Sequence, residues 1–337
     1  MIYLVHSSFA ALDSLSILAS LARHHRPVGP TVRQIAARLI DGEDHEAGNY
    51  TVRYTGLLEA AIGSDAAGLP VKLVSWSSEN HHLGRADAAV RLIDEVAALE
   101  SVAGQRVMFW GHGHAGNVFA IMSQLLTCEP AALERFFDAA SVYYQLPFTG
   151  LVDIPVWHRV RQLLSCNRHR IAERAYDWVT FGTPVRYGWK LRRDDRLLHF
   201  VHHRPPAGGP AHLAIFPPRA EDVLSAASGD YLQQVAIAGT DAPPSPAAWR
   251  SWLANRRLGR LLAAEHEPTG LATRLETGMR VPDCGTTLLV DYGTQAGTPA
   301  EQLAGHAVYT RPEWLLFHAE QVVERLFGGG NTGCRAA

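Results

Sequence analysis

The sequence has few of the features that are typical of exported, membrane-spanning or disulfide-stabilised proteins. It contains only four cysteines, at Cys128, Cys166, Cys284 and Cys334. They are far apart and include no Cys-x-x-Cys pair, which favours thiols in a reducing compartment over a disulfide framework. The N-terminal MIYLVHSSF lacks the charged start and longer apolar run of a signal peptide. No apolar run approaches the ~18 residues that span a bilayer. We therefore expect a cytoplasmic protein without a transmembrane segment.

Charge of one sign is also missing. The 31 basic and 33 acidic residues give a net charge of −2, without a long block of either sign. Nucleic acids and anionic membranes are therefore not indicated as partners. The chain has no G-x-G-x-x-G, G-x-x-x-x-G-K-[S/T] or H-E-x-x-H pattern, so no dinucleotide, P-loop or zinc-protease site is indicated. No cofactor is predicted, and the sequence gives no indication of the oligomeric state.

Histidine, in contrast, is abundant, with 17 residues. The H-x-H sequence at His112 and His114 is a possible chelating pair. No Asp, Glu or Cys lies beside it at ligand spacing, so we predict no metal and keep a metal site as a minor alternative.

Apolar runs alternate with amphipathic helical patterns along the chain. This order predicts an α/β fold with a mostly parallel central sheet flanked by helices. We expect strands at 2–6, 70–77, 106–111, 177–185, 197–203, 231–239 and 286–293. Helices are expected between them, with the closing helix at 311–327. The pattern indicates a single domain over 1–327, followed by a tail at 328–337 whose composition is typical of flexible segments.

The stretch RVMFWGHGHAGNVFAI, residues 106–121, reads as a buried strand, a tight turn and the start of a helix. The G-x-S-x-G pattern builds such a turn, in which small residues two positions before and after the central serine relieve crowding. Here Gly111 and Ala115 are the small neighbours, and Gly116 continues the close packing. The central residue is Gly113. An ordinary glycine-rich turn between strand and helix is the alternative interpretation.

Four segments, in order, resemble the α/β-hydrolase-fold lipases and esterases. GHGHAGN resembles their GHSHGGN-type nucleophile elbow, and FGTPVRYGW (181–189) is similar to the strand after their lid region. GHAVYTRPEWLLFH (305–318) resembles the segment with the catalytic histidine. YLVHSSF (3–9) stands where the family has its oxyanion loop. The resemblance covers nearly the whole chain and implies an α/β-hydrolase fold with a helical lid or cap insertion.

The resemblance also assigns candidate catalytic residues. His306 matches the general base, and the family's chain order is nucleophile, acid, histidine. Asp241 follows the expected strand at 231–239 and is the first candidate for the acid, with Asp291 as the runner-up. A carboxylate there would orient the histidine and stabilise its imidazolium form. The alternatives are a surface loop for His306 and a turn for Asp241.

The oxyanion hole is expected to combine the backbone N–H of His114 with one from Ser8 or Phe9 in the first loop. Ser7 stands where the family usually has glycine, which departs from its pattern. The helix that starts near His114 adds a dipole that favours negative charge.

The insertion at about 129–176 is helical and rich in aromatic residues, which fits a lid over a pocket as well as it fits ordinary core helices. The candidate substrate-binding residues are Ser77, Tyr143, Tyr144, Phe148 and Trp157. Core packing explains the aromatic residues equally well, and a polar loop explains Ser77.

The central departure from the family is Gly113, which has no side chain to attack a carbonyl. One interpretation is a carboxylic-ester hydrolase for an uncharged apolar ester, with its nucleophile replaced and its activity nearly lost. The other is a non-catalytic member that binds a small hydrophobic ligand or a protein partner.

Overall fold

The computed structural model describes residues 1–6, 48–62, 69–99, 105–146, 149–166, 171, 173–211, 213, 220–237, 241–262, 284–293 and 297–328. In this part of the chain, six parallel strands form one sheet in the order β2-β1-β3-β4-β5-β6. Their bounds are β1 Ile2–Val5, β2 Val71–Val74, β3 Arg106–His112, β4 Ala175–Phe181, β5 Arg196–His202 and β6 Thr286–Val290. The α/β class and the mostly parallel sheet are confirmed.

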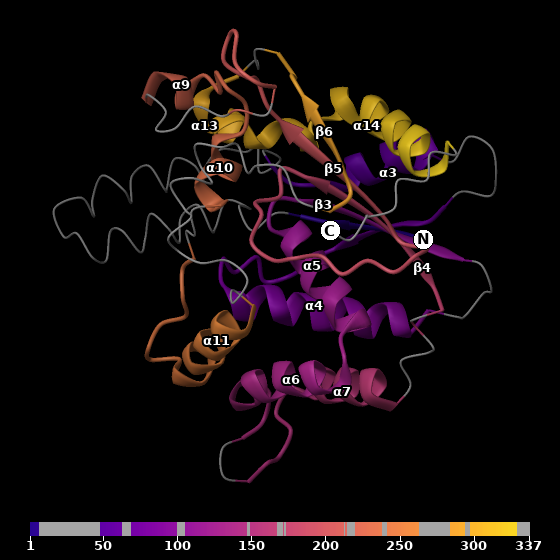
Figure 1. The fold of residues 1–337 in the computed structure, drawn as a ribbon, viewed down its shortest axis with the longest axis vertical. Coiled ribbons are helices and arrows are strands. Elements are labelled where there is room, and N and C mark those ends of the chain that lie inside the picture. Colours follow the sequence, from indigo (N-terminus) through magenta and orange to yellow (C-terminus); the bar gives the residue numbers. More distant parts are fainter. Residues whose placement is uncertain are drawn as a thin grey trace, which may run out of the picture.

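Helices cover both faces of this sheet (Figure 1). Side chains of a strand alternate between the two faces. Val107 and Phe109 of β3 therefore pack in one apolar cluster with α4 (His82–Ala97) and α5 (Ala115–Thr127). Met108 and Trp110 pack in the other cluster, with α3 (Val52–Ile62) and α14 (Leu315–Val322). Burial of both faces explains why β3 is a nearly continuous apolar run.

The insertion forms α6 (Pro130–Tyr144) and α7 (Pro155–Cys166), which lie outside α4 together with α11 (Trp249–Leu262) (Figure 1). Two of the predicted substrate-binding aromatics belong to the core of this layer. Tyr144 and Trp157 are fully buried and stack with ring centroids 5.3 Å apart. The indole N–H of Trp157 donates to Asp87 of α4 at 2.7 Å. The described part of the insertion thus packs as core helices, the alternative to a lid.

The strand predicted at 231–239 is wrong, because this segment forms helix α10 (Tyr231–Ile237). Asp230 explains the difference. Its Oδ1 accepts a hydrogen bond from the backbone N–H of Gln233 at 2.9 Å, as an N-terminal helix cap does. This cap stabilises the first turn of a helix. The apolar residues of 231–237 therefore form a helix, although their composition also suits a strand.

Shorter elements complete the described chain: α9 (Ala220–Leu224), α13 (Pro299–Gln302), 3-10 helices at Leu303–Thr310 and Pro312–Trp314, and a π-helical turn at Val323–Phe327. In the described ranges, no helix has the length and apolar character needed to cross a membrane. Cys128 and Cys166 are thiols, whereas Cys284 is disulfide-bonded, so the expectation of thiols alone is wrong at this position.

Candidate functional site

The turn between β3 and α5 has the geometry expected of an elbow. Gly113 sits between the two elements with φ +55°, a backbone conformation that glycine adopts without steric cost. Its N–H donates to the carbonyl of Phe181 at 2.8 Å, and its own carbonyl accepts from the Thr183 hydroxyl at 2.8 Å. The FGTP segment therefore fixes the backbone of position 113 on both sides.

The small residues around Gly113 are required by packing. A Cβ at Gly111 would overlap the ring of Phe119 and come within 3.0 Å of the Ala115 methyl group. A Cβ at Gly116 would overlap Thr183. The steric reason for the small-residue pattern in the sequence is thus present in the structure.

His306, the predicted base, lies in the 3-10 helix Leu303–Thr310 after β6. Its Nδ1 is 2.7 Å from Oδ2 of Asp230, and both side chains are buried. Because a carboxylate only accepts, Nδ1 carries the proton and Nε2 is the basic nitrogen. Asp230 Oδ2 also accepts from the Tyr309 hydroxyl at 3.1 Å. The carboxylate therefore fixes both the tautomer and the orientation of the imidazole.

The imidazole of His306 lies beside the elbow. It stacks on the ring of His112, the residue before Gly113, with centroids 4.2 Å apart. The two ring nitrogens of His112 face carbonyl oxygens of Gly48 and His306, at 2.9 and 3.0 Å. Burial, reinforced by His306, lowers the pKa of His112 to about 3. His112 is therefore neutral near pH 7 and donates to one of these carbonyls at a time.

Asp230 is distant from β5 in sequence but is held at its carboxyl end. Its N–H donates to the carbonyl of His202 at 3.0 Å, and Gly229 forms an antiparallel bridge with His203. A Cβ at Gly182 would lie 2.6 Å from Asp230 Oδ2, so the glycine of the FGTP segment permits this close approach. Asp230 was not among the candidates predicted from the sequence. Its signal was the D-x-x-Q spacing to Gln233, which is typical of a capped helix start.

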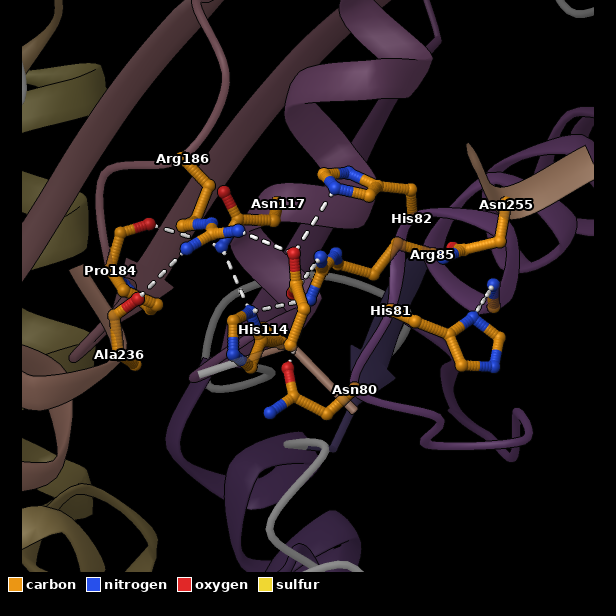
Figure 2. A network of polar contacts seen from close by, with 12 residues as sticks. Asn80, His81, His82, Arg85, His114, Asn117, Pro184, Arg186, Ala236 and Asn255 are labelled. Atoms are coloured by element: carbon orange, nitrogen blue, oxygen red, sulfur yellow. Dashed lines mark hydrogen bonds and ion pairs between the residues drawn. The ribbon is translucent and has the colours of Figure 1, made fainter. Parts of the chain in front are cut away.

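The two aspartates predicted as the acid lie elsewhere. Asp241 accepts from Arg85 at 2.6 Å, from Arg186 at 2.6 Å and from His82 at 3.1 Å, in a network of polar contacts drawn in Figure 2. Asp291 is half-exposed and pairs with Arg204 at 2.7 Å. The structure pairs His306 with Asp230 and brings neither predicted acid to it.

The pKa of Asp241 reflects its contacts with the two arginines. Burial alone would raise the pKa of its carboxyl group, but the charges of Arg85 and Arg186 and the hydrogen bond from His82 hold it well below the usual range. Burial likewise lowers the pKa of His82, against the pull of Asp241. Asp241 is therefore a permanent anion that balances part of the charge of two guanidinium groups.

The remaining predicted site residues are only partly described. His114 is the residue before α5 and makes no side-chain capping hydrogen bond; its Nδ1 accepts from Asn117 at 3.1 Å and Arg85 at 3.4 Å. Burial and the two nearby arginines hold the pKa of His114 well below its usual value, so the ring is neutral. Ser77 is exposed and bonds Glu79, and Tyr143 is partly buried against the core. Ser8, Phe9 and Phe148 lie outside the described residues.

The position of the elbow in the sheet matches a general rule for parallel sheets. The chain passes from β1 outward to β2 and then from β3 in the opposite direction, so β1 and β3 flank the switch point of the topology. Ligands of open α/β sheets bind at the carboxyl edge of such a point. Gly113 follows β3 there. Within the described ranges, no three His, Cys, Asp or Glu side chains are grouped as a metal site requires.

The chain matches no protein-family model, and no curated protein or solved structure is similar enough to it to count as a match. Its function has to be inferred from the chemistry of the site.

Proposed function

We propose that this chain is an α/β-hydrolase-type protein of the lipase and esterase class, with its serine nucleophile position occupied by Gly113. The observation that carries the proposal is the buried contact of 2.7 Å between His306 Nδ1 and Asp230 Oδ2. The ring of His306 stacks on that of His112, the residue before Gly113. Position 113 follows β3, Asp230 lies at the end of β5 and His306 follows β6. This is the chain order of nucleophile, acid and histidine in that class.

With serine at position 113, the site would supply each part of ester hydrolysis. His306 Nε2 would take the hydroxyl proton as Oγ attacks the ester carbonyl carbon. The N–H of His114, at the start of α5, would stabilise the resulting oxyanion. The imidazolium, held by Asp230, would then protonate the departing alkoxide and leave an acyl-enzyme for water to hydrolyse. Gly113 has no hydroxyl, so the chain is inactive by this route. The substrate class is an uncharged, apolar ester in its reacting part.

A second candidate function is non-catalytic binding of a small hydrophobic ligand or a protein partner. Gly113 itself favours it, because a retained site without a nucleophile binds without turnover. The two candidates differ in whether the rest of the machinery still works.

The decisive test is hydrolysis of p-nitrophenyl acetate, butyrate and octanoate by the wild type, Gly113→Ser and Gly113→Ala. Both variants place a side chain at a positive φ, at a cost on the order of 1–3 kcal/mol, but only one carries a hydroxyl. We expect hydrolysis by Gly113→Ser alone, and its loss on adding His306→Ala. A folded Gly113→Ser variant that is silent on all three esters would favour the binding function. Activity in Gly113→Ala or the wild type would place the chemistry elsewhere.

A further inference from the structure

The described residues of the polar cluster around Asp241 carry an excess of positive charge. Tyr187 OH accepts from Arg85 Nε at 2.9 Å, so its proton is directed to Nδ1 of His82, 2.8 Å away. His82 Nε2, which then carries the ring proton, lies 3.1 Å from Asp241. This chain of hydrogen bonds needs neutral His82 and neutral Tyr187. Among the described residues, the charges of the cluster are therefore those of Arg85 and Arg186 against Asp241, or 2 − 1 = +1.

The two arginines differ in how fully their donors are used. Arg85 is completely buried and donates to Tyr187, to Asn80 at 3.0 Å and to Asp241 at 2.6 Å, besides its contact with His114. Arg186 is 13% exposed. It donates through Nη2 to Asp241 and through Nη1 to the carbonyl of Ala236 at a long 3.4 Å. Arg186 is thus the guanidinium that can offer donors to an incoming group.

The cluster adjoins the elbow. His114, which follows Gly113, contacts Arg85, and its neighbour Asn117 bonds both His114 and the carbonyl of Pro184, two residues before Arg186. Figure 2 shows Arg186, His114 and Asn117 facing one another at the start of α5. A group bound at Arg186 would therefore lie close to a carbonyl held by the His114 N–H.

We propose that Arg186, supported by Arg85, binds a carboxylate of the ligand, so that the favoured substrate class is the monoester of a dicarboxylic acid. This assignment rests on the proposed function only for the ester half of the ligand. The excess is a single positive charge in a largely buried place, which is costly unless a counter-charge arrives. A carboxylate supplies one negative charge and fits the planar guanidinium fork.

The test compares two ligands that differ in charge but hardly in shape. Binding of monomethyl succinate and of its neutral amide, methyl succinamate, is measured by isothermal titration to the wild type. We expect the anion to bind about tenfold more tightly or better, as hydrogen bonds to a charged group allow. Arg186→Gln should bind both ligands alike, and Arg186→Lys should keep part of the preference. Arg204→Gln, which removes a surface arginine paired with Asp291, is the matched control and should keep all of it.

Each outcome decides the proposal. Equal affinities in the wild type, no binding of either ligand, or a preference that survives in a folded Arg186→Gln variant would overturn it. Displacement of monomethyl succinate by equimolar inorganic phosphate would show a site for phosphate and overturn the carboxylate assignment. A carboxylate preference in the wild type, with a folded Gly113→Ser variant that hydrolyses neither the p-nitrophenyl esters nor monomethyl succinate, would support the anion site and refute the hydrolase proposal. An active Gly113→Ser variant of a protein without the carboxylate preference would support the hydrolase proposal and refute the anion site.

Discussion

Asp230 and Asp241 lie on either side of helix α10, but their surroundings are opposite. Asp230 is completely buried, and its partners are an imidazole, a phenol hydroxyl and a backbone N–H. Asp241 is 19% exposed and is held by two guanidinium groups and His82. One carboxylate is thus bound by an imidazole, a hydroxyl group and a backbone amide, and the other by two guanidinium groups and an imidazole.

This difference decides what each aspartate can do. A carboxylate that faces an imidazole lowers the energy of the imidazolium when a proton arrives, because a new opposite charge then forms beside it. A carboxylate that already faces two cations stabilises an additional positive charge only weakly, and its removal would leave those cations uncompensated. We therefore expect Asp230 to matter for catalysis and Asp241 for stability.

The largest expected effect separates the two aspartates by activity. In the Gly113→Ser background, Asp230→Asn should lower the gained esterase kcat by about 10⁴-fold, as loss of the orienting carboxylate does in serine hydrolases. Asp241→Asn in the same background should cost less than about tenfold, because Asp241 does not touch His306. Steady-state kinetics on p-nitrophenyl butyrate measures both. Comparable losses in two folded variants would show that the contrast between the aspartates is wrong.

For stability in the wild-type background, we expect the replacement of Asp241 to have a larger effect than the replacement of Asp230. Asp241→Asn removes the counter-charge that Asp241 gives to the buried Arg85 and the mostly buried Arg186, and should lower the free energy of unfolding by about 3–5 kcal/mol. Asp230→Asn disturbs the hydrogen bonds with His306 and Tyr309 and should cost about 1–3 kcal/mol. Urea unfolding at pH 7 gives both values. A larger loss for Asp230→Asn would mean that Asp241 and its arginines do not form the buried ion cluster.

Buried neutral histidines give a third, smaller effect, which depends on pH. Burial lowers the pKa of His112 and His318 to about 3 and that of His199 to about 4, from 6.5. Below pH 6.5 these histidines bind protons in the unfolded chain but stay neutral in the folded chain. Stability should therefore fall toward pH 4, by about 1.4 kcal/mol per pH unit for each of the three.

His318→Gln tests this pH dependence. It should remove about one third of the slope between pH 6 and 4.5, measured by urea unfolding at several pH values. An unchanged slope in His318→Gln would show that His318 is not the neutral, buried group that the structure describes.

The sheet was predictable because its signal is local. Continuous apolar runs such as VMFWG are typical of parallel strands that helices cover on both faces. The small residues Gly111 and Ala115 predict a tight turn. His306 was found because its surroundings resemble a known segment. These features depend on residues adjacent in sequence.

The contact between His306 and Asp230 was not predicted because the position of Asp230 depends on a long return of the chain. Asp230 reaches β5 through the His203–Gly229 bridge and fits only because Gly182 lacks a side chain. Neither contact leaves a pattern near Asp230. The apolar run at 231–239 was assigned as a strand, which moved the expected acid to Asp241. The capping spacing from Asp230 to Gln233 was the local signal that could have indicated both the helix and Asp230.

The smallest expected effect concerns Asp291, the other predicted acid. Its pair with Arg204 is exposed on both sides, at 50% and 35% of the side chain, so solvent screens the attraction. Asp291→Asn should change the free energy of unfolding by less than about 1 kcal/mol and leave the esterase activity of Gly113→Ser within about twofold. The same urea and kinetic measurements apply. A loss of activity like that of Asp230→Asn would return Asp291 to the catalytic site and would require a different arrangement of the loop that carries His306.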